Sequence, residues 1–212
     1  MSDAGPVTAT QLVADGVLDA ELAGLLWLLL ERDIPLVVSG PPSAEPAGLA
    51  QVLKRLASDS GRGNGPAALQ LWLLEADSLE GVLAHFAAPP LGWSEDRLRT
   101  LGLVLIVDEV PGLGRRLRAA HYLRPVERDA AGHLQRRPPA LLAAHDRGAD
   151  RLEHFDWAIT GELADRLGLS MVQFEHELHL RRDALAGLVA AGRLGADDLR
   201  RVAGGIRPSG PH

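Results

Sequence analysis

The chain of 212 residues contains no cysteine. This absence excludes disulfides, thiolate nucleophiles and zinc sites built from cysteine. Lysine is also scarce, because Lys54 is the only one, whereas arginine, alanine, glycine, leucine and proline are abundant. The formal net charge of −6 argues against a general binder of nucleic acid or of anionic membranes.

Targeting and membrane-spanning patterns are missing as well. Residues Met1–Thr10 hold neither a basic region nor an apolar one, so no secretory signal is predicted. The most apolar run, Leu22–Leu30, is much shorter than a membrane span. We therefore expect a cytoplasmic protein without membrane insertion, long enough for one domain, or for one domain with a small appendage.

Apolar runs and capping residues predict an α/β fold in the first half of the chain. Near-continuously apolar strands are typical of a mainly parallel sheet with helices on both faces. The predicted strands are Ile34–Ser39, Leu69–Leu74 and Leu101–Val107. The predicted helices are Leu18–Arg32, starting near Asp19, Gly48–Leu56 and Ser78–Ala87, with a loop at Ser58–Pro66.

After Gly112 the pattern changes to hairpins and helices. Ser170, followed by Gln173, forms a capping box that opens a helix running to Gly192. Its apolar stripe of Phe174, Leu178, Leu185 and Leu188 is expected to pack inward, and its polar face of Glu175, Glu177, His179, Arg182 and Asp183 to face solvent. Before it, the sequence predicts an antiparallel strand at Arg115–Val126, a turn at Asp129–Gly132, and a hairpin of Leu141–Ala144 with Arg151–Phe155.

The first predicted strand runs into a segment with the layout of a phosphate-binding loop, G-x-x-x-x-G-K-[ST]. When the motif is aligned from Gly40, Glu45 stands at the position of its second glycine, Pro46 at that of its lysine and Ala47 at that of its serine or threonine. Glu45 places negative charge where phosphates would sit, Pro46 supplies neither a cation nor an N–H donor, and Ala47 has no hydroxyl for Mg²⁺. The sequence predicts the outline of a nucleotide site without its chemistry.

Asp108 and Glu109 follow the third apolar strand in the manner of a Walker B motif. Such acids would bind magnesium and activate water, although two acids at the exposed end of a core strand give the same pattern. The functional interpretation is weakened because the loop at Gly40 has lost the other ligands of Mg²⁺ and phosphate.

Two further patterns are candidate sites. His176 and His179 are one residue too close for a zinc-protease helix, and the other histidines show no ligand spacing, so no metal site is predicted. Leu163–Ser170 is similar to the turn of a helix-turn-helix DNA reader. Residues Glu162–Gly192 carry five acids against three arginines, a net −2 that is unfavourable beside phosphates.

Several stretches together resemble the ATPase core of type II/IV secretion and archaeal-type pilus or flagellar motor proteins. The most specific match is Glu75–Leu91, which is similar to that family's histidine box, H-A-[DE]-S, with its following helix and S-P-P turn. In that box Glu75 stands in place of the histidine, and Asp77 and Ser78 fit the pattern. The remaining matches are Leu12–Trp27, Leu36–Leu53, Leu101–Val126 and Glu162–Ala191 with its paired Arg181 and Arg182.

The chain departs from the family at the positions that bind nucleotide and catalyse its hydrolysis in that family. Besides the loop and histidine-box replacements, the run Lys54–Leu69 is too short for the acidic box and Walker B strand, so Asp108 and Glu109 follow a later strand in this alignment. The resemblance implies a truncated RecA-like P-loop-type α/β domain with a mainly parallel sheet. Its expected segments are a core (1–126), a β-hairpin extension (127–157), a helical tail (158–203) and a disordered tail (204–212).

For function, the resemblance implies a non-catalytic pseudo-ATPase that needs neither ATP nor magnesium. The expected role is protein association in a pilus or secretion assembly, with an active secretion ATPase or its membrane platform as partner, and this role rests on analogy of fold. Two alternatives stay open: a DNA-binding regulator acting through the C-terminal helices, and a residual nucleotide binder.

Overall fold

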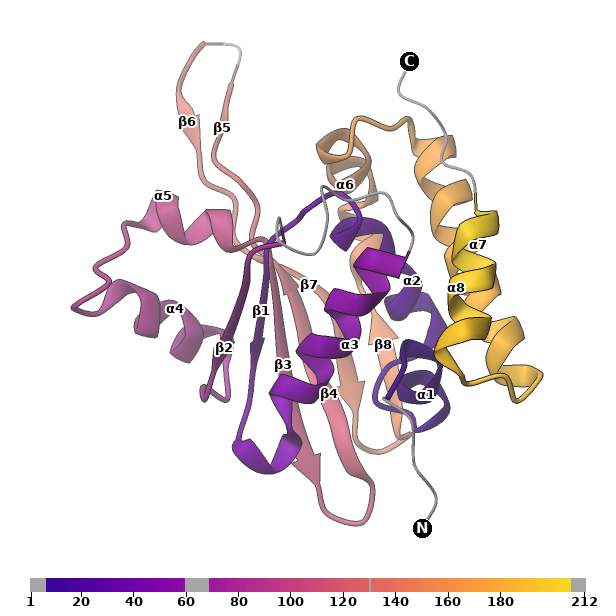
Figure 1. Cartoon of the computed structure of the whole chain (residues 1–212). Helices are drawn as coiled ribbons and strands as arrows, with labels where there is room; N and C mark the ends of the chain where they lie inside the picture. Colours follow the sequence, from indigo (N-terminus) through magenta and orange to yellow (C-terminus); the bar gives the residue numbers. More distant parts are fainter. Residues whose placement is uncertain (1–6, 60–68, 130, 207–212) are drawn as a thin grey trace. The chain divides into compact units, whose positions relative to one another are not determined.

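The computed structural model describes residues 7–59, 69–129 and 131–206 and divides into two compact units (Figure 1). The helical unit comprises Met1–Asp33, Gly48–Leu69 and Trp157–His212. The sheet unit comprises Ile34–Ala47 and Gln70–Asp156. Each unit is therefore assembled from segments that lie far apart in the sequence.

Two sequence predictions fall mainly on residues outside this description. The predicted loop at Ser58–Pro66 overlaps residues 60–68, and the predicted tail at 204–212 overlaps residues 207–212.

Capping side chains set the starts of the main helices in the helical unit. Asp19 accepts a hydrogen bond from the Leu22 N–H at 2.9 Å, and Ser170 accepts one from the Gln173 N–H at 3.3 Å. The Gln173 side chain in turn accepts from the Ser170 N–H, so the predicted capping box is confirmed. The helices are α1 (Ala9–Ala14), α2 (Ala20–Leu30), α3 (Pro46–Asp59, which begins in the sheet unit), α6 (Thr160–Arg166), α7 (Met171–Ala190) and α8 (Ala196–Gly205).

Helix α2 is buried almost throughout and packs along α7. It has 11 residues, and within residues 7–59, 69–129 and 131–206 no helix combines the length and apolar character needed to cross a membrane. The predicted apolar stripe of α7 is confirmed, because Phe174, Leu178, Leu185 and Leu188 are all buried.

A buried ionic network joins α2 to α7. The guanidinium of Arg181, 1% exposed, donates to the Glu177 carboxylate at 2.6 Å and also to the Glu31 carboxylate. Glu31 accepts a further hydrogen bond from the Trp27 indole N–H at 2.7 Å. The prediction that Glu177 faces solvent is therefore wrong: at 1% exposure it is buried, because Arg181, one turn later, brings a compensating charge into the helix interface.

Gly24 allows the two helices to approach closely. A Cβ atom added at this position of α2 would lie 2.9 Å from the backbone nitrogen of Arg182 on α7. Since a backbone atom cannot swing aside as a side chain does, any larger residue would push the helices apart.

The sheet unit contains a six-stranded sheet and a separate two-stranded ribbon. The strands of the sheet are β1 (Leu36–Ser39), β2 (Leu71–Leu74), β3 (Leu103–Val110), β4 (Gly114–Tyr122), β7 (Ala140–Asp146) and β8 (Arg151–His154). The ribbon is β5 (Glu127–Arg128) with β6 (Leu134–Gln135), and Figure 1 shows it extending away from the sheet. The helices of this unit are α4 (Leu79–Ala87) and α5 (Glu95–Leu98), with the short 3-10 helices η1 (Pro42–Ala44) and η2 (Arg99–Leu101), and η3 (Asp156–Ala158) lies at its boundary.

The strand order is β2-β1-β3-β4-β7-β8. β1 lies beside both other apolar strands and pairs with each in parallel. The α/β class is confirmed, but the prediction of a mainly parallel sheet is wrong, because the β3–β4, β4–β7 and β7–β8 pairs are antiparallel. The connection Pro111–Leu113 between β3 and β4 shows why: three residues can form a hairpin turn but cannot make the crossover that a parallel pair requires.

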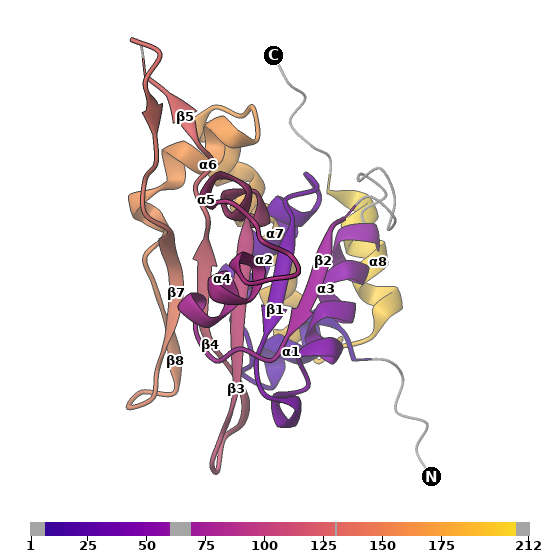
Figure 2. The same cartoon turned by 90° about the vertical axis from the view of Figure 1, so that its left-hand side faces the viewer.

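Helices α4 and α5 lie against the strands of this unit (Figure 2). Phe86 and Val82 of α4 enter an apolar cluster with Val37, Val104 and Ile106 of the sheet. Trp72 and Trp93 extend this cluster toward the surface, where the Arg97 guanidinium lies 4.1 Å from the centre of the Trp93 ring.

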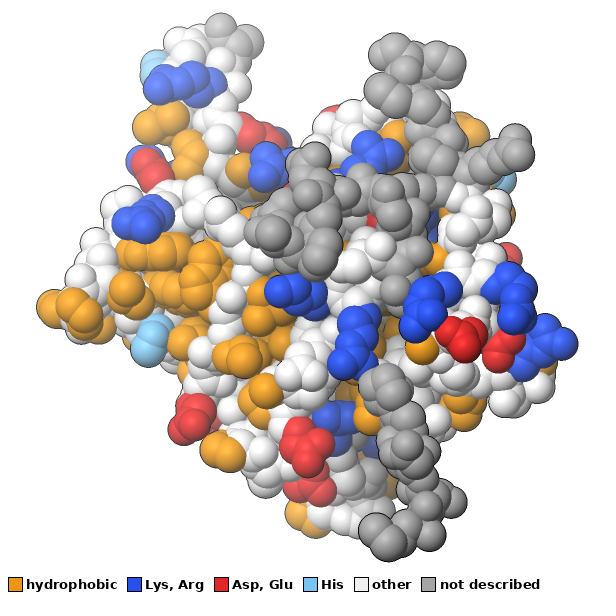
Figure 3. All heavy atoms as spheres, in the orientation of Figure 1, with side chains coloured by type: hydrophobic (Ala, Val, Ile, Leu, Met, Phe, Trp, Pro, Cys, Tyr) orange, Lys and Arg blue, Asp and Glu red, His pale blue; other side chains and the backbone are white. Residues whose placement is uncertain are grey.

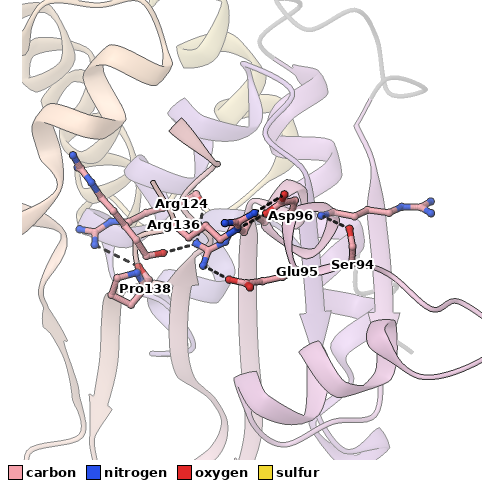
Figure 4. Close-up of polar contacts among 9 residues, drawn as sticks. Ser94, Glu95, Asp96, Arg124, Arg136 and Pro138 are labelled. Carbon is pink, nitrogen blue, oxygen red and sulfur yellow. Dashed lines mark hydrogen bonds and ion pairs between the residues drawn. The ribbon is translucent and has the colours of Figure 1, made fainter. Parts of the chain in front are cut away.

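An ion-pair network fastens α5 to the base of the ribbon (Figure 4). Arg136 donates to both carboxylate oxygens of Asp96, at 2.7 and 3.0 Å, and this contact lowers the pKa of Asp96. Arg99 pairs with Glu95 at 2.9 Å, and Arg124 donates to the carbonyl of Pro138 at 3.4 Å.

We predict that Arg181→Met lowers the free energy of unfolding by about 3–5 kcal/mol, because it leaves two carboxylates buried without their cation. Arg182→Met is the matched control, since Arg182 is partly exposed and pairs with Glu21 and Asp183 on the surface. Its expected cost is below about 1 kcal/mol. Urea denaturation followed by circular dichroism measures both, and equal losses would contradict the assignment.

A second pair of variants tests the helix contact. Gly24→Ala should lower stability by about 1–3 kcal/mol through overpacking. Gly187→Ala on α7, where an added Cβ meets nothing within 4 Å, should instead raise stability by about 0.5–1 kcal/mol through helix propensity. Opposite shifts of the urea midpoint are expected; a stabilising Gly24→Ala would show that α2 and α7 are not in close contact.

Candidate functional site

The segment that resembles a phosphate-binding loop follows β1 directly. Ser39 ends the strand, Pro42–Ala44 form η1, and Pro46 opens α3. Glu45 takes the left-handed conformation, with φ 48° and ψ 55°, at the position where the motif has glycine. Packing explains why position 40 is a glycine, because an added Cβ atom would clash with the carbonyl oxygen of Val107.

The backbone of this loop has few N–H groups to offer a phosphate. Pro41, Pro42 and Pro46 have no N–H. Three further donors are used internally: Gly40 donates to the Leu74 carbonyl at 3.2 Å, Ala44 to Pro41 at 3.0 Å and Glu45 to Pro42 at 3.1 Å. Phosphate loops bind by pointing successive N–H groups at the anion, and six of the eight residues 40–47 cannot do so in this conformation.

The segment that resembles a histidine box lies next to this loop, at the carboxyl end of β2. The Ser39 hydroxyl donates to the Ala76 carbonyl at 2.7 Å and accepts from the Ala76 N–H at 2.9 Å, so it holds the segment against β1. Ser78 caps α4 by accepting from the Gly81 N–H at 3.3 Å. The Asp77 carbonyl accepts from Arg118, while the side chain of Glu75 is exposed.

The structure brings these two predicted segments together in one pocket. This pocket has a volume of about 570 Å³. It is lined by Pro46, Ala47, Leu73, Leu74, Glu75, Ala76, Gly81 and His85. Its walls are mainly apolar, and the lining has one carboxylate and neither lysine nor arginine. This composition suits an apolar side chain with a basic neighbour better than a triphosphate.

Asp108 and Glu109 are not among the residues that line this pocket. Both lie within β3, which continues to Val110, three residues beyond the predicted end of the strand. Asp108 is 3.5 Å from Arg147 and also accepts from the Glu109 N–H.

A charged cluster that the sequence did not indicate joins β4 to the β7–β8 turn. Asp150 accepts two hydrogen bonds from Arg116, at 2.9 and 3.1 Å, and lies 2.9 Å from His145 Nε2. The Arg116 contact, with a smaller contribution from His145, lowers the pKa of Asp150 from 3.8 to about 2. The residues are 34 and 5 positions apart, so no local spacing could have shown the cluster.

The other weighed candidates lie in the helical unit. His176 and His179 are exposed on α7, and among the described residues no group of three or more His, Asp or Glu side chains is arranged to hold a metal. The helix-turn-helix-like string forms the end of α6 and the turn into α7. Of the three arginines counted there, Arg181 is buried against carboxylates, so it is not presented to a phosphate backbone.

We predict that the Asp150 carboxyl titrates with a midpoint of about 2 in the folded protein. Because this pKa is lower than in the unfolded chain, the interaction stabilises the fold fully above pH 3.8, and this stabilisation is lost as the pH falls through about 2. NMR titration of the side-chain carboxyl measures the midpoint. In Arg116→Gln it should move up toward 3.8, whereas Arg118→Gln, on the same strand, should leave it in place.

The sequence was also compared with known proteins. Neither the models of protein families nor the curated proteins compared with the chain match it. The function is therefore inferred from the chain's own residues and from the geometry described above.

Proposed function

We propose that this chain is a catalytically silent, shortened relative of the type II/IV secretion ATPases, with a reduced RecA-like core, and that it acts by binding another protein. The parallel order β2-β1-β3, with the loop leaving the central strand and opening a helix, supports the relation to P-loop domains. The partner that fits this proposal is an active secretion ATPase or its membrane platform.

The absence of catalysis is inferred from the loss of N–H donors in the loop at Gly40. Nucleotide binding by such a loop depends on several N–H groups, a lysine and a hydroxyl acting on the same phosphates. Here prolines and internal hydrogen bonds remove most of the N–H groups. Glu45 adds a carboxylate at the same place, with its side chain 77% exposed.

A role in protein binding is supported by the surface of the sheet unit. Hydrophobic side chains gather over α4, α5 and the connection between them (Figure 3). Leu91 in this connection is 44% exposed and Leu73 of β2 is 47% exposed. Contiguous apolar surface of this kind is typical of sites where proteins associate.

Titration calorimetry with Mg-ATP tests the proposal, and we expect no measurable binding. Each charge-assisted hydrogen bond to a phosphate contributes about 1.5–3 kcal/mol, so the loss of lysine, hydroxyl and N–H donors together removes most of the affinity. Asp108→Asn should give the same flat titration. Micromolar affinity in the native protein that is lost in Asp108→Asn would overturn the proposal and restore the Walker B interpretation.

A further inference from the structure

Strand β2 lies at one edge of the six-stranded sheet, and among the described residues it pairs with β1 only. The carbonyl of Gln70 accepts a hydrogen bond from Leu36 of β1, and that of Leu74 accepts one from Gly40, directly after β1. Since the backbone groups of successive strand residues alternate in direction, the N–H and C=O groups of Leu71 and Leu73 point away from β1. These two residues present the pattern that a further strand would bind.

The described residues of β2 include no lysine, proline, bulge or charge that would prevent strand addition. Edge strands are commonly protected by lysine, proline, a bulge or an inward-pointing charge. The sequence of β2 is Leu-Trp-Leu-Leu, its register with β1 is regular, and Leu73 is 47% exposed.

The surroundings of the edge select the chemistry of an added strand. The pocket described above begins at Leu73 and Leu74, so a side chain of the added strand can enter its apolar walls. Glu75 lines the pocket, and three further exposed acids are the chain neighbours of lining residues: Glu45, Asp77 and Glu80. The two nearby arginines offset them only in part, since Arg115 lies 3.6 Å from Glu45 and Arg118 donates to a backbone carbonyl.

We propose that β2 is the docking edge for an extended segment of a partner protein in which apolar and basic residues alternate. The segment adds a strand to the sheet, places an apolar side chain in the pocket and sets its basic side chains beside Glu75 and its acidic neighbours. This inference rests on the proposed function, which makes protein binding the role of the chain.

The test uses the full chain and an acetylated heptapeptide of alternating valine and lysine, with a valine–glutamate peptide as its charge control. NMR detects binding and measures amide hydrogen exchange with and without peptide. The amides of Leu71 and Leu73 should exchange more slowly when the lysine peptide is bound, whereas the amide of Trp72, which faces β1, should be unchanged. The glutamate peptide should bind at least about tenfold more weakly.

Three variants separate the contributions of backbone, side chain and charge. Leu73→Pro removes the outward N–H and should weaken binding about tenfold, whereas Leu73→Ala keeps that N–H and should weaken binding less. Glu75→Lys, an exposed change, should reduce the preference for the lysine peptide, because it removes one of the four acids and adds a cation. The amide exchange of the native protein decides the question even if Leu73→Pro does not fold.

Other outcomes overturn the inference. They are absence of peptide binding, binding without protection of Leu71 and Leu73, and protection in the free protein that grows with protein concentration, which would identify a second copy as the occupant. Each of these is distinct from failure of the proposed function, which is measured by Mg-ATP binding and not by peptide.

Discussion

The hydrogen bonds that β1 makes on both of its sides determine the geometry of the sheet unit. This strand of four residues is fully buried and pairs in parallel with β2 and β3. Its central position directs the loop at Gly40 between the ends of its two neighbours, and it leaves β2 at the edge of the sheet. The position of the loop at Gly40, the pocket and the edge position of β2 are therefore consequences of one strand's place in the order.

The helical unit depends on a different kind of contact. Helices α2 and α7 meet where Gly24 allows close approach and where Arg181 is enclosed by Glu31 and Glu177. An apolar interface would tolerate sliding of one helix along the other, whereas a guanidinium held by carboxylates from both helices fixes their register. The network thus contributes specificity of packing even where its net stabilisation is modest.

Much of the fold could be predicted from the sequence because its signals are local. Capping at Asp19, Ser78 and Ser170 and the apolar runs of three strands gave helices and strands close to those observed. Whether the sheet is mainly parallel or antiparallel could not be predicted in this way, because that depends on whether later strands return by short turns or by crossovers.

The candidate site could be predicted only in part for the same reason. The loop and the Glu75 segment each stood out by motif, but their meeting in one pocket depends on the pairing of β1 with β2. The burial of Glu177 was missed because helical periodicity describes one helix at a time, and the charge that makes burial possible includes Glu31, 150 residues from Arg181. The pairing of Asp150 with Arg116 leaves no pattern in the sequence, because Arg116 lies on β4, 34 residues from the turn that contains Asp150.

The three prolines of the loop bear on how this chain can change over evolutionary time. A silent site that has lost one lysine can regain activity by a single substitution. Phosphate binding by this loop would need N–H donors at several prolines, a cation and the removal of the acid at Glu45, and each step alone leaves an anion without adequate ligands. A phosphate site could therefore arise here only through several substitutions together.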